Sequence, residues 1–287
     1  MTLSRPRTYT RAQPTEADIL AALGRYRAYI AEANHRAMSA ILPAIETAHI
    51  DDPDLFESPE EEEEARLDFF DRLINPPDNT QPPIERPSDI LTHWDLVVSQ
   101  LSLDGTSVNA DPEWRATKRD MYRSAILDGL GRLECPTGQW NLPLDFEILM
   151  RHVDSLEGHG WAKLRDETER LIFWVGWGGP GSGTETHEKI QKRVLAGQTI
   201  VDATAFYNYD VAGGWLSGVG GESAVYVAYT RPKGNESQGW SWRYLVTMGQ
   251  FGDECFDDIV GVLDWYKHHS ELHESELEVT AAEIFAP

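Results

Sequence analysis

Apolar residues at helical spacing predict a long helix near the start of the chain. From Ile19 to Ala44 they recur every three or four positions, as in a helix with one buried face. Thr15 and Asp18 have the spacing of a capping box at its start, and Pro43 is expected to kink or end the helix. The stripe either packs on the protein itself or docks a partner. It consists of Ile19, Leu23, Tyr26, Ile30, Ala33, Ala37, Ala40 and Ala44.

A second, shorter helix is predicted over residues 59–74, where the charge pattern is strongly acidic. Ser58 and Pro59 suit a helix N-terminus, and acids in the first turn match the positive end of the helix dipole. Residues 51–71 hold eleven acids against one arginine. This tract is either a solvated helix start or a docking site for a basic partner. Its five consecutive glutamates are Glu60, Glu61, Glu62, Glu63 and Glu64.

From residue 88 onward the pattern predicts helices and then a sheet. Helical spacing covers residues 88–101, 111–134 and 142–153. After residue 170, apolar residues alternate with polar ones, which is typical of strands with one buried face. These alternating segments are 171–177, 201–210, 223–229 and 240–248, followed by a closing helix from Asp253 to Tyr266. The sequence therefore predicts an α+β fold in which a mostly antiparallel sheet of about four to six strands packs against helices.

Proline and charge distribution predict four parts. Residues 1–14 carry three arginines and few bulky apolar residues, so we expect a disordered tail. Residues 15–74 form a helical extension with the acidic tract. The prolines of residues 75–87 mark a linker, and the main domain is residues 88–287.

Charge and cysteine content narrow the function classes. The 287 residues carry 48 Asp and Glu against 25 Lys and Arg, a net charge of −23, which disfavours binding to nucleic acid or anionic lipid. No apolar run is long enough to span a bilayer, and no secretory signal is evident. Two cysteines, Cys135 and Cys255, are too few for a disulfide scaffold. We therefore expect a protein of the cytoplasm, or of the nucleus.

A short motif links the chain to a known family. Leu142-Pro143-Leu144-Asp145-Phe146 resembles the Leu-Pro-x-Asp-Tyr motif that opens a helix in the SMI1/KNR4 family, also called the SUKH superfamily. Residues 253–265, which include Phe256, resemble the closing helix of that family. The Asn-Gly turn of the family is absent, and residues 154–158 stand in its place. The likeness covers roughly residues 88–270.

The resemblance implies a function without catalysis. Members of this family are interaction modules: bacterial relatives serve as immunity proteins against toxins, and the founding fungal type regulates cell-wall synthesis and cell-integrity signalling. The helical extension and acidic linker resemble the eukaryotic type. Pro143 suits a helix start, and Asp145 is expected to accept hydrogen bonds from the first turn of its own helix. The motif residues with expected structural roles are Leu142, Pro143, Asp145, Phe146 and Phe256.

The glycine-rich segment from Gly176 to Gly183 is the main sign of a different function, a nucleotide-binding enzyme. It contains a formal GxGxxG after a predicted strand, with Asp202 about 20 residues beyond. Against this interpretation, Pro180 and the glycines after it are poorly suited to start the helix whose N–H groups would hold a pyrophosphate.

Other candidate chemistry is weak. His268, His269 and His273 could share a metal, but their order is not that of a zinc protease and they lie at a predicted helix end. Neither cysteine has surroundings that would activate it, and Ser217 lacks the nucleophile-elbow pattern. The sequence therefore predicts no catalytic residues, no cofactor and no metal site.

Three tryptophans complete the set of candidate residues. Trp215, Trp240 and Trp242 lie among strands and glycine-rich segments, and an exposed tryptophan there would suit a protein interface or stack on a sugar. The leading hypothesis is a non-catalytic module that binds a protein partner. The alternatives are a nucleotide-binding enzyme that uses the Gly176–Gly183 loop and a carbohydrate-binding module that uses exposed tryptophans.

Overall fold

The computed structural model describes residues 13–51, 55–74, 76, 80–159, 171–174, 185–234, 237–248, 252–269, 271 and 277–286. The chain divides into two compact units, which are described separately below. Unit 1 comprises Met1–Tyr26, Thr106–Glu157 and Thr168–Tyr266, and unit 2 comprises Arg27–Gly105, Gly158–Glu167 and Lys267–Pro287. The expected boundary between residues 87 and 88 is not a point at which the chain passes from one unit to the other.

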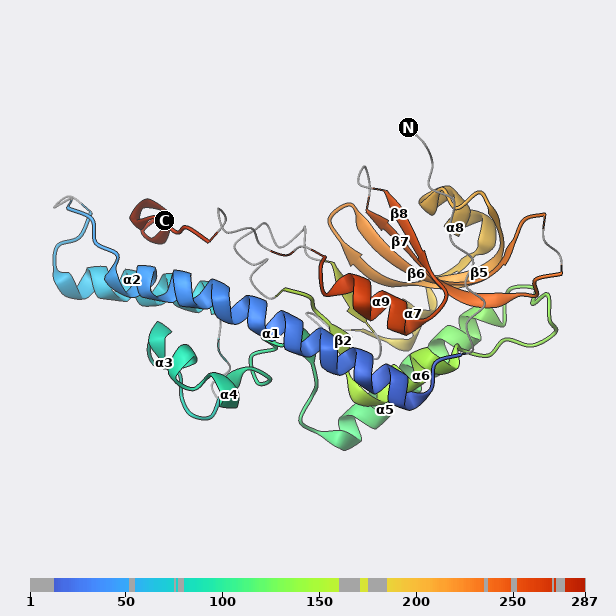
Figure 1. Cartoon of the computed structure of the whole chain (residues 1–287), viewed down its shortest axis with the longest axis horizontal. Coiled ribbons are helices and arrows are strands. Elements are labelled where there is room, and N and C mark those ends of the chain that lie inside the picture. Colours follow the sequence, from blue (N-terminus) through green and yellow to red (C-terminus); the bar gives the residue numbers. More distant parts are fainter. Residues whose placement is uncertain are drawn as a thin grey trace. The chain divides into compact units, whose positions relative to one another are not determined.

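Unit 1 is built on an antiparallel sheet (Figure 1). Its strands are β1 (Thr106–Ser107), β2 (Ser155–Leu156), β3 (Ile172–Trp174), β4 (Val194–Ala196), β5 (Tyr209–Gly220), β6 (Ser223–Pro232), β7 (Ser241–Met248) and β8 (Asp253–Phe256). The order is β1-β2-β3-β5-β6-β7-β8, and β4 also pairs with β5. The α+β prediction is confirmed, with eight strands among the described residues rather than four to six.

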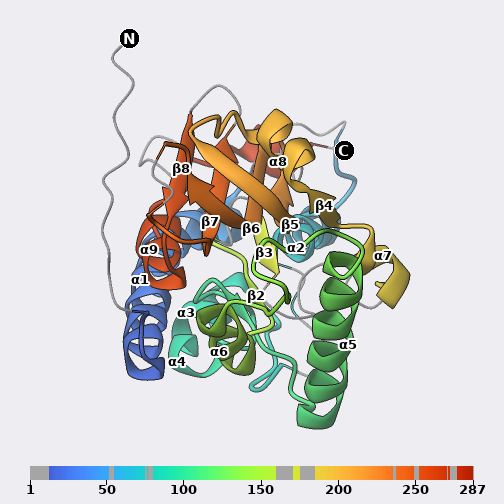
Figure 2. The same ribbon diagram turned by 90° about the vertical axis from the view of Figure 1, so that its right-hand side faces the viewer.

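Helices cover both faces of this sheet. Strand register places Gly214, Ala228 and Leu245 toward α8 (Gly197–Thr204), where Ile200 packs against them. The opposite face carries the side chains that meet α6 (Leu144–His152) and α9 (Ile259–Tyr266). α5 (Pro112–Leu130) runs beside β4, with α7 (His187–Gln191) next to it (Figure 2). Unit 1 therefore has its sheet between two helical layers.

Unit 2 is helical among its described residues. It contains most of α1 (Glu16–Thr47), together with α2 (Pro59–Ile74), α3 (Pro87–Thr92), α4 (Trp94–Val97) and α10 (Ala281–Ile284). Its core draws large apolar side chains from α1, α2, α3, α4 and the C-terminal segment. The most buried members include Met38, Ile41, Leu42, Ile45, Phe70, Ile90, Val97 and Ile284.

The buried face of α1 differs from the predicted stripe in its second half. Thr15 and Asp18 form the expected capping box, with Thr15 N donating to Asp18 Oδ2 at 3.0 Å and Asp18 N donating to Thr15 Oγ1 at 3.2 Å. After Ile30 the buried positions are Asn34, Ala37, Met38, Ile41, Leu42 and Ile45, while Ala40 is exposed. The reason is that a 3.5-residue repeat drifts around a 3.6-residue helix. The helix also continues past Pro43 to Thr47.

Two predicted elements are corrected by the structure. Residues 201–210 were expected to form a strand, but α8 ends only at Thr204 and β5 starts at Tyr209. The positions buried in α8 are Gly197, Ile200, Val201 and Thr204, a helical spacing that the alternation of small residues masks. The closing helix starts at Ile259 rather than Asp253, because Asp253–Phe256 pairs with β7 as the edge strand β8.

Candidate functional site

Trp240 and Trp242 lie in a cluster of half-buried rings at one end of β6 and β7. Tyr229 has its ring centroid 5.8 Å from that of Trp240 and 5.0 Å from that of Trp242, and the ring of Trp140 lies 6.0 Å from Trp242. All four residues are half-buried. We call Trp140, Tyr229, Trp240 and Trp242 the aromatic surface. It belongs entirely to unit 1.

Strand pairing and three polar contacts hold three of these rings in place, and the ring of Trp240 stacks on that of Tyr229. Tyr229 and Trp242 are direct cross-strand partners. The indole of Trp242 donates to Asn141 O at 2.9 Å, and the indole of Trp140 donates to Leu133 O at 3.1 Å. The Tyr229 hydroxyl lies 3.3 Å from Thr137 Oγ1. The connection between α5 and α6 therefore holds the surface in one arrangement.

A cation completes the aromatic surface. The guanidinium of Arg231 lies 5.0 Å from the Trp240 ring centroid, and it donates to Asp210 Oδ2 at 2.9 Å. Arg231 is half-buried, and its guanidinium is ion-paired with Asp210 while it lies over the Trp240 ring. The set of tryptophans, a tyrosine and an arginine has the composition that protein interfaces favour at their energetic centre.

Trp215 does not belong to this surface. Its side chain has no exposed area, and its ring centroid lies 5.4 Å from those of both Phe146 and Trp242. Strand β5 directs Trp215 into the face of the sheet that α6 covers, because side chains alternate between faces. The expectation that Trp215 offers a platform to a partner is corrected: it is a core residue.

Asp145 of the Leu-Pro-x-Asp motif joins three elements of unit 1. Its Oδ1 accepts hydrogen bonds from Phe146 N at 2.9 Å and from the Tyr244 hydroxyl at 3.0 Å, and its Oδ2 accepts one from Ile259 N at 2.8 Å. The bond to Phe146 lies in the first turn of α6, as expected. The other two reach β7 and the first residue of α9, which the sequence did not indicate.

The electrostatic setting of Asp145 follows from this burial. Desolvation raises the pKa of the Asp145 carboxyl, and the hydrogen bonds from Ile259, Tyr244 and Phe146 counteract only part of that rise. Burial likewise raises the pKa of the Tyr244 hydroxyl well above its usual value, with the Asp145 charge adding to the effect. The pair is therefore a buried structural link between helix and sheet.

The other motif residues are also structural. Leu142 and Pro143 are buried, and Pro143 is the N-cap residue of α6. Phe146 is fully buried among Tyr122, Phe173 and Trp215. Phe256 is half-buried and its ring lies 5.7 Å from that of Trp265 on α9.

The comparisons with known proteins assign the chain to no family. No family model, curated protein or solved structure matches this chain. The resemblance to the SMI1/KNR4 family therefore rests on the motif and on the order of elements alone. None of the helices in the described part of the chain combines the length and the apolar character that crossing a membrane would require.

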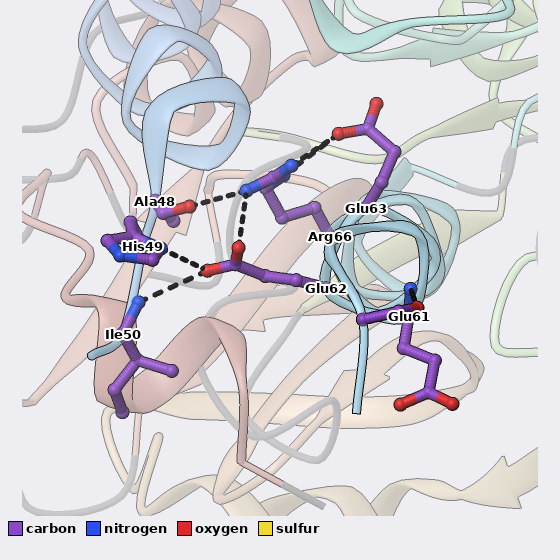
Figure 3. A network of polar contacts seen from close by, with 8 residues as sticks. Ala48, His49, Ile50, Glu61, Glu62, Glu63 and Arg66 are labelled. Carbon is purple, nitrogen blue, oxygen red and sulfur yellow. Dashed lines mark hydrogen bonds and ion pairs between the residues drawn. The ribbon is translucent and has the colours of Figure 1, made fainter. Parts of the chain in front are cut away.

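The five consecutive glutamates of the acidic tract lie in the first two turns of α2 in unit 2, and one of them, Glu62, has an internal role (Figure 3). Glu62 Oε1 lies 2.8 Å from His49 Nδ1 and accepts a hydrogen bond from Ile50 N at 3.2 Å. Arg66, which lies 3.9 Å from the other carboxylate oxygen, donates to Ala48 O at 2.6 Å. Glu62 and Arg66 thereby tie α2 to the chain that leaves α1.

The remaining glutamates of the tract point to solvent. Glu60, Glu61, Glu63 and Glu64 are exposed, and Glu63 pairs with Arg66. Glu61 accepts a hydrogen bond from Glu57 N at 2.8 Å, and its own N–H bonds to Ser58 Oγ, as expected of a helix cap. Four of the five glutamates are therefore exposed on α2, and one of these four is ion-paired within the helix.

We predict that Glu62→Gln lowers the thermal stability of the protein more than Glu64→Gln does. Partial burial raises the pKa of the Glu62 carboxyl, but the bonds from His49 and Ile50 outweigh it, and the pKa lies below its ordinary value. The stabilising effect of Glu62 is therefore present above about pH 4.5 and is lost as the pH falls through the folded-state pKa. Thermal melts of both variants between pH 7 and pH 3 test this, and equal melting temperatures for the two variants at pH 7 would contradict it.

The described histidines near the C-terminus pack against aromatic and buried surroundings instead of forming the metal site considered above. The Tyr29 hydroxyl donates to Glu271 at 2.7 Å, and its ring lies 4.6 Å from that of His268. Burial lowers the pKa of His269 to about 4, so this imidazole is neutral at neutral pH. Within the described residues, no group of three or more His, Cys, Asp and Glu side chains is placed to hold a metal ion. His273 lies outside the described residues.

Two further predictions fall partly or wholly outside the described residues. The glycines from Gly176 to Gly183, on which the nucleotide-binding alternative depends, lie outside the described residues. The tail over residues 1–14 is described only from residue 13.

Trp140 and Arg231 lie beside the predicted residues Trp240 and Trp242, but neither was among the surface residues predicted from the sequence. Nothing in the local pattern distinguishes Trp140, because the connection between α5 and α6 brings it to the sheet.

Proposed function

We propose that the protein is a non-catalytic module that binds a protein partner through the aromatic surface of unit 1. The observation that carries the proposal is the cluster of four half-buried rings with the guanidinium of Arg231 beside them. Trp140, Tyr229 and Trp242 are held by hydrogen bonds and Trp240 stacks on Tyr229, so these rings lose little conformational entropy when a partner covers them. The proposed role is thus recognition by a preformed surface.

The family resemblance supplies the finer proposal. It implies a regulator, in the manner of the fungal proteins that act in cell-wall synthesis and cell-integrity signalling. The support for it is the Leu142–Phe146 motif, whose Asp145 fastens α9 to the sheet. This role of Asp145 stabilises the fold and does not identify the partner, so binding of a partner has to be measured directly.

We predict that Trp240→Ala weakens binding of the partner by at least tenfold, because an interface tryptophan typically contributes about 2 kcal/mol or more. Trp114→Ala is the matched control: Trp114 is also half-buried and stacks with a cation, Lys118, but lies on α5 away from the surface. The full chain is used because Tyr26 of α1 stacks on Tyr266 within unit 1, so a fragment starting at residue 88 would lose part of the core. A partner captured from host lysate and identified by mass spectrometry is purified, and its Kd is measured calorimetrically.

Three results would contradict the proposal. The first is a partner whose affinity is the same for wild type, Trp240→Ala and Trp114→Ala. The second is saturable, micromolar quenching of tryptophan fluorescence by NAD or ATP, which would favour the enzyme. The third is binding on a glycan array that Trp240→Ala abolishes, which would favour the carbohydrate-binding alternative.

A further inference from the structure

A groove of about 530 Å³ lies on unit 2, between α2, α10 and the segment that precedes α2. Its apolar lining includes Phe56, Ala65, Ile284 and Phe285, and the rings of Phe56 and Phe285 meet at 5.1 Å. This volume is in the range of sites that bury a bulky side chain or a small ligand. Ile284 and Phe285 are held by α10, which a Thr280–Glu283 capping box secures.

Acidic residues line one side of the groove. Asp68 and Asp71 both contact it, and both are exposed. Together with Glu61 and Glu64 they follow at spacings of three, four and three residues, which places all four on one stripe of α2. Arg72 is the cation at this rim, and it lies over the Phe69 ring at 5.9 Å. The stripe therefore keeps a strong negative charge.

We propose that this groove is a docking site for a basic peptide segment with a bulky apolar anchor. The apolar lining provides burial for the anchor, and the stripe from Glu61 to Asp71 provides charge complementarity for lysines or arginines beside it. The net charge of −23 disfavours a second copy of the same chain as the occupant. This inference does not depend on the aromatic surface, because every lining residue of the groove belongs to unit 2.

The probe is a fluorescein-labelled, amidated 16-residue helical peptide with leucines on one face and lysines on the other, titrated with the full chain at low salt. Two related peptides carry serine for every leucine or glutamate for every lysine. We expect saturable binding of the first peptide only, with affinity falling as salt is added. Asp68→Asn combined with Asp71→Asn is expected to raise Kd about tenfold. Ala65→Phe, which fills the groove, is expected to abolish binding.

The matched control removes the same charge elsewhere. Asp120→Asn combined with Asp253→Asn neutralises two exposed carboxylates of unit 1 and is expected to change Kd by less than about twofold. Equal weakening by both double variants, or equal binding of the serine peptide, would show general charge attraction and overturn the proposal. Binding lost in Trp240→Ala but kept in Asp68→Asn/Asp71→Asn would also overturn it, because the aromatic surface would then be the site. Thermal melts show whether each variant is folded.

Discussion

Replacing Asp145 by alanine is expected to destabilise the protein by about 3 kcal/mol or more, because three buried donors lose their acceptor at once. The N–H of Ile259, at the start of α9, loses the carboxylate oxygen that caps the helix. The Tyr244 hydroxyl is left inside the core without its acceptor. Removing the desolvation cost of the carboxylate offsets part of this loss, so the effect is smaller than the sum of three charged hydrogen bonds. Urea denaturation monitored by tryptophan fluorescence measures the change.

Two milder variants separate the hydrogen bonds from the space that Asp145 fills. Asp145→Asn keeps the shape but replaces one acceptor oxygen by a donor, and we expect a loss of about 1–2 kcal/mol. Tyr244→Phe removes one donor and should cost a similar amount. If all three variants are as stable as wild type, Asp145 does not link α6, β7 and α9 as the distances indicate.

The pH dependence of the Asp145 variants has a definite sign. The folded-state pKa of Asp145 lies above its ordinary value because of burial, so the folded chain takes up this proton at a higher pH than the unfolded chain. The contribution of Asp145 to stability is therefore largest below about pH 4 and decreases as the pH rises through the folded-state pKa. The stability advantage of wild type over Asp145→Asn should accordingly grow on acidification.

The sequence predicted elements well where local signals agree with burial. The capping box at Thr15, the cap at Ser58 and the alternation over residues 223–229 and 240–248 all correspond to observed features. It failed where tertiary contacts override the local pattern. β5 contains four glycines in twelve residues, a composition that argues against a strand, yet its neighbours β4 and β6 supply the pairing.

The candidate surfaces were less predictable than the fold. A sequence shows that Trp215, Trp240 and Trp242 are aromatic but not which of them other side chains cover. The register places Trp215 and Trp242 on the same face of the sheet, yet of the three tryptophans only Trp215 is buried completely. The groove on unit 2 depends on Phe56 and Phe285, which are more than 200 residues apart in the chain. Such pairs have no local signal, because their proximity follows from packing of the whole unit.

The close approach of α8 to β5 gives the second large effect. We expect Gly197→Ala to destabilise the protein by about 3 kcal/mol or more, at the upper end of overpacking effects. A Cβ at Gly197 would lie 1.7 Å from the carbonyl oxygen of Val211 and 2.4 Å from its carbonyl carbon. These are backbone atoms of β5, so no side-chain rotation relieves the clash.

The structural consequence of Gly197→Ala follows from its position in the chain. Gly197 comes directly after β4, whose last residue, Ala196, pairs with Gly213 of β5. Moving α8 away from the sheet to admit a methyl group would therefore weaken the β4–β5 pairing. It would also displace Ile200, which packs against Gly214. The measurement is the free energy of unfolding in urea, together with the loss of near-UV circular dichroism from the tryptophans.

Gly24→Ala is the matched control for this substitution. Gly24 is an exposed position inside α1, and a Cβ there meets no atom within 4 Å. Because alanine favours the helix, this variant should be more stable than wild type by about 0.5–1 kcal/mol. The same chemical change is thus expected to have opposite signs at two positions. Equal effects at both would mean that α8 and β5 do not approach as closely as the distances at Gly197 require.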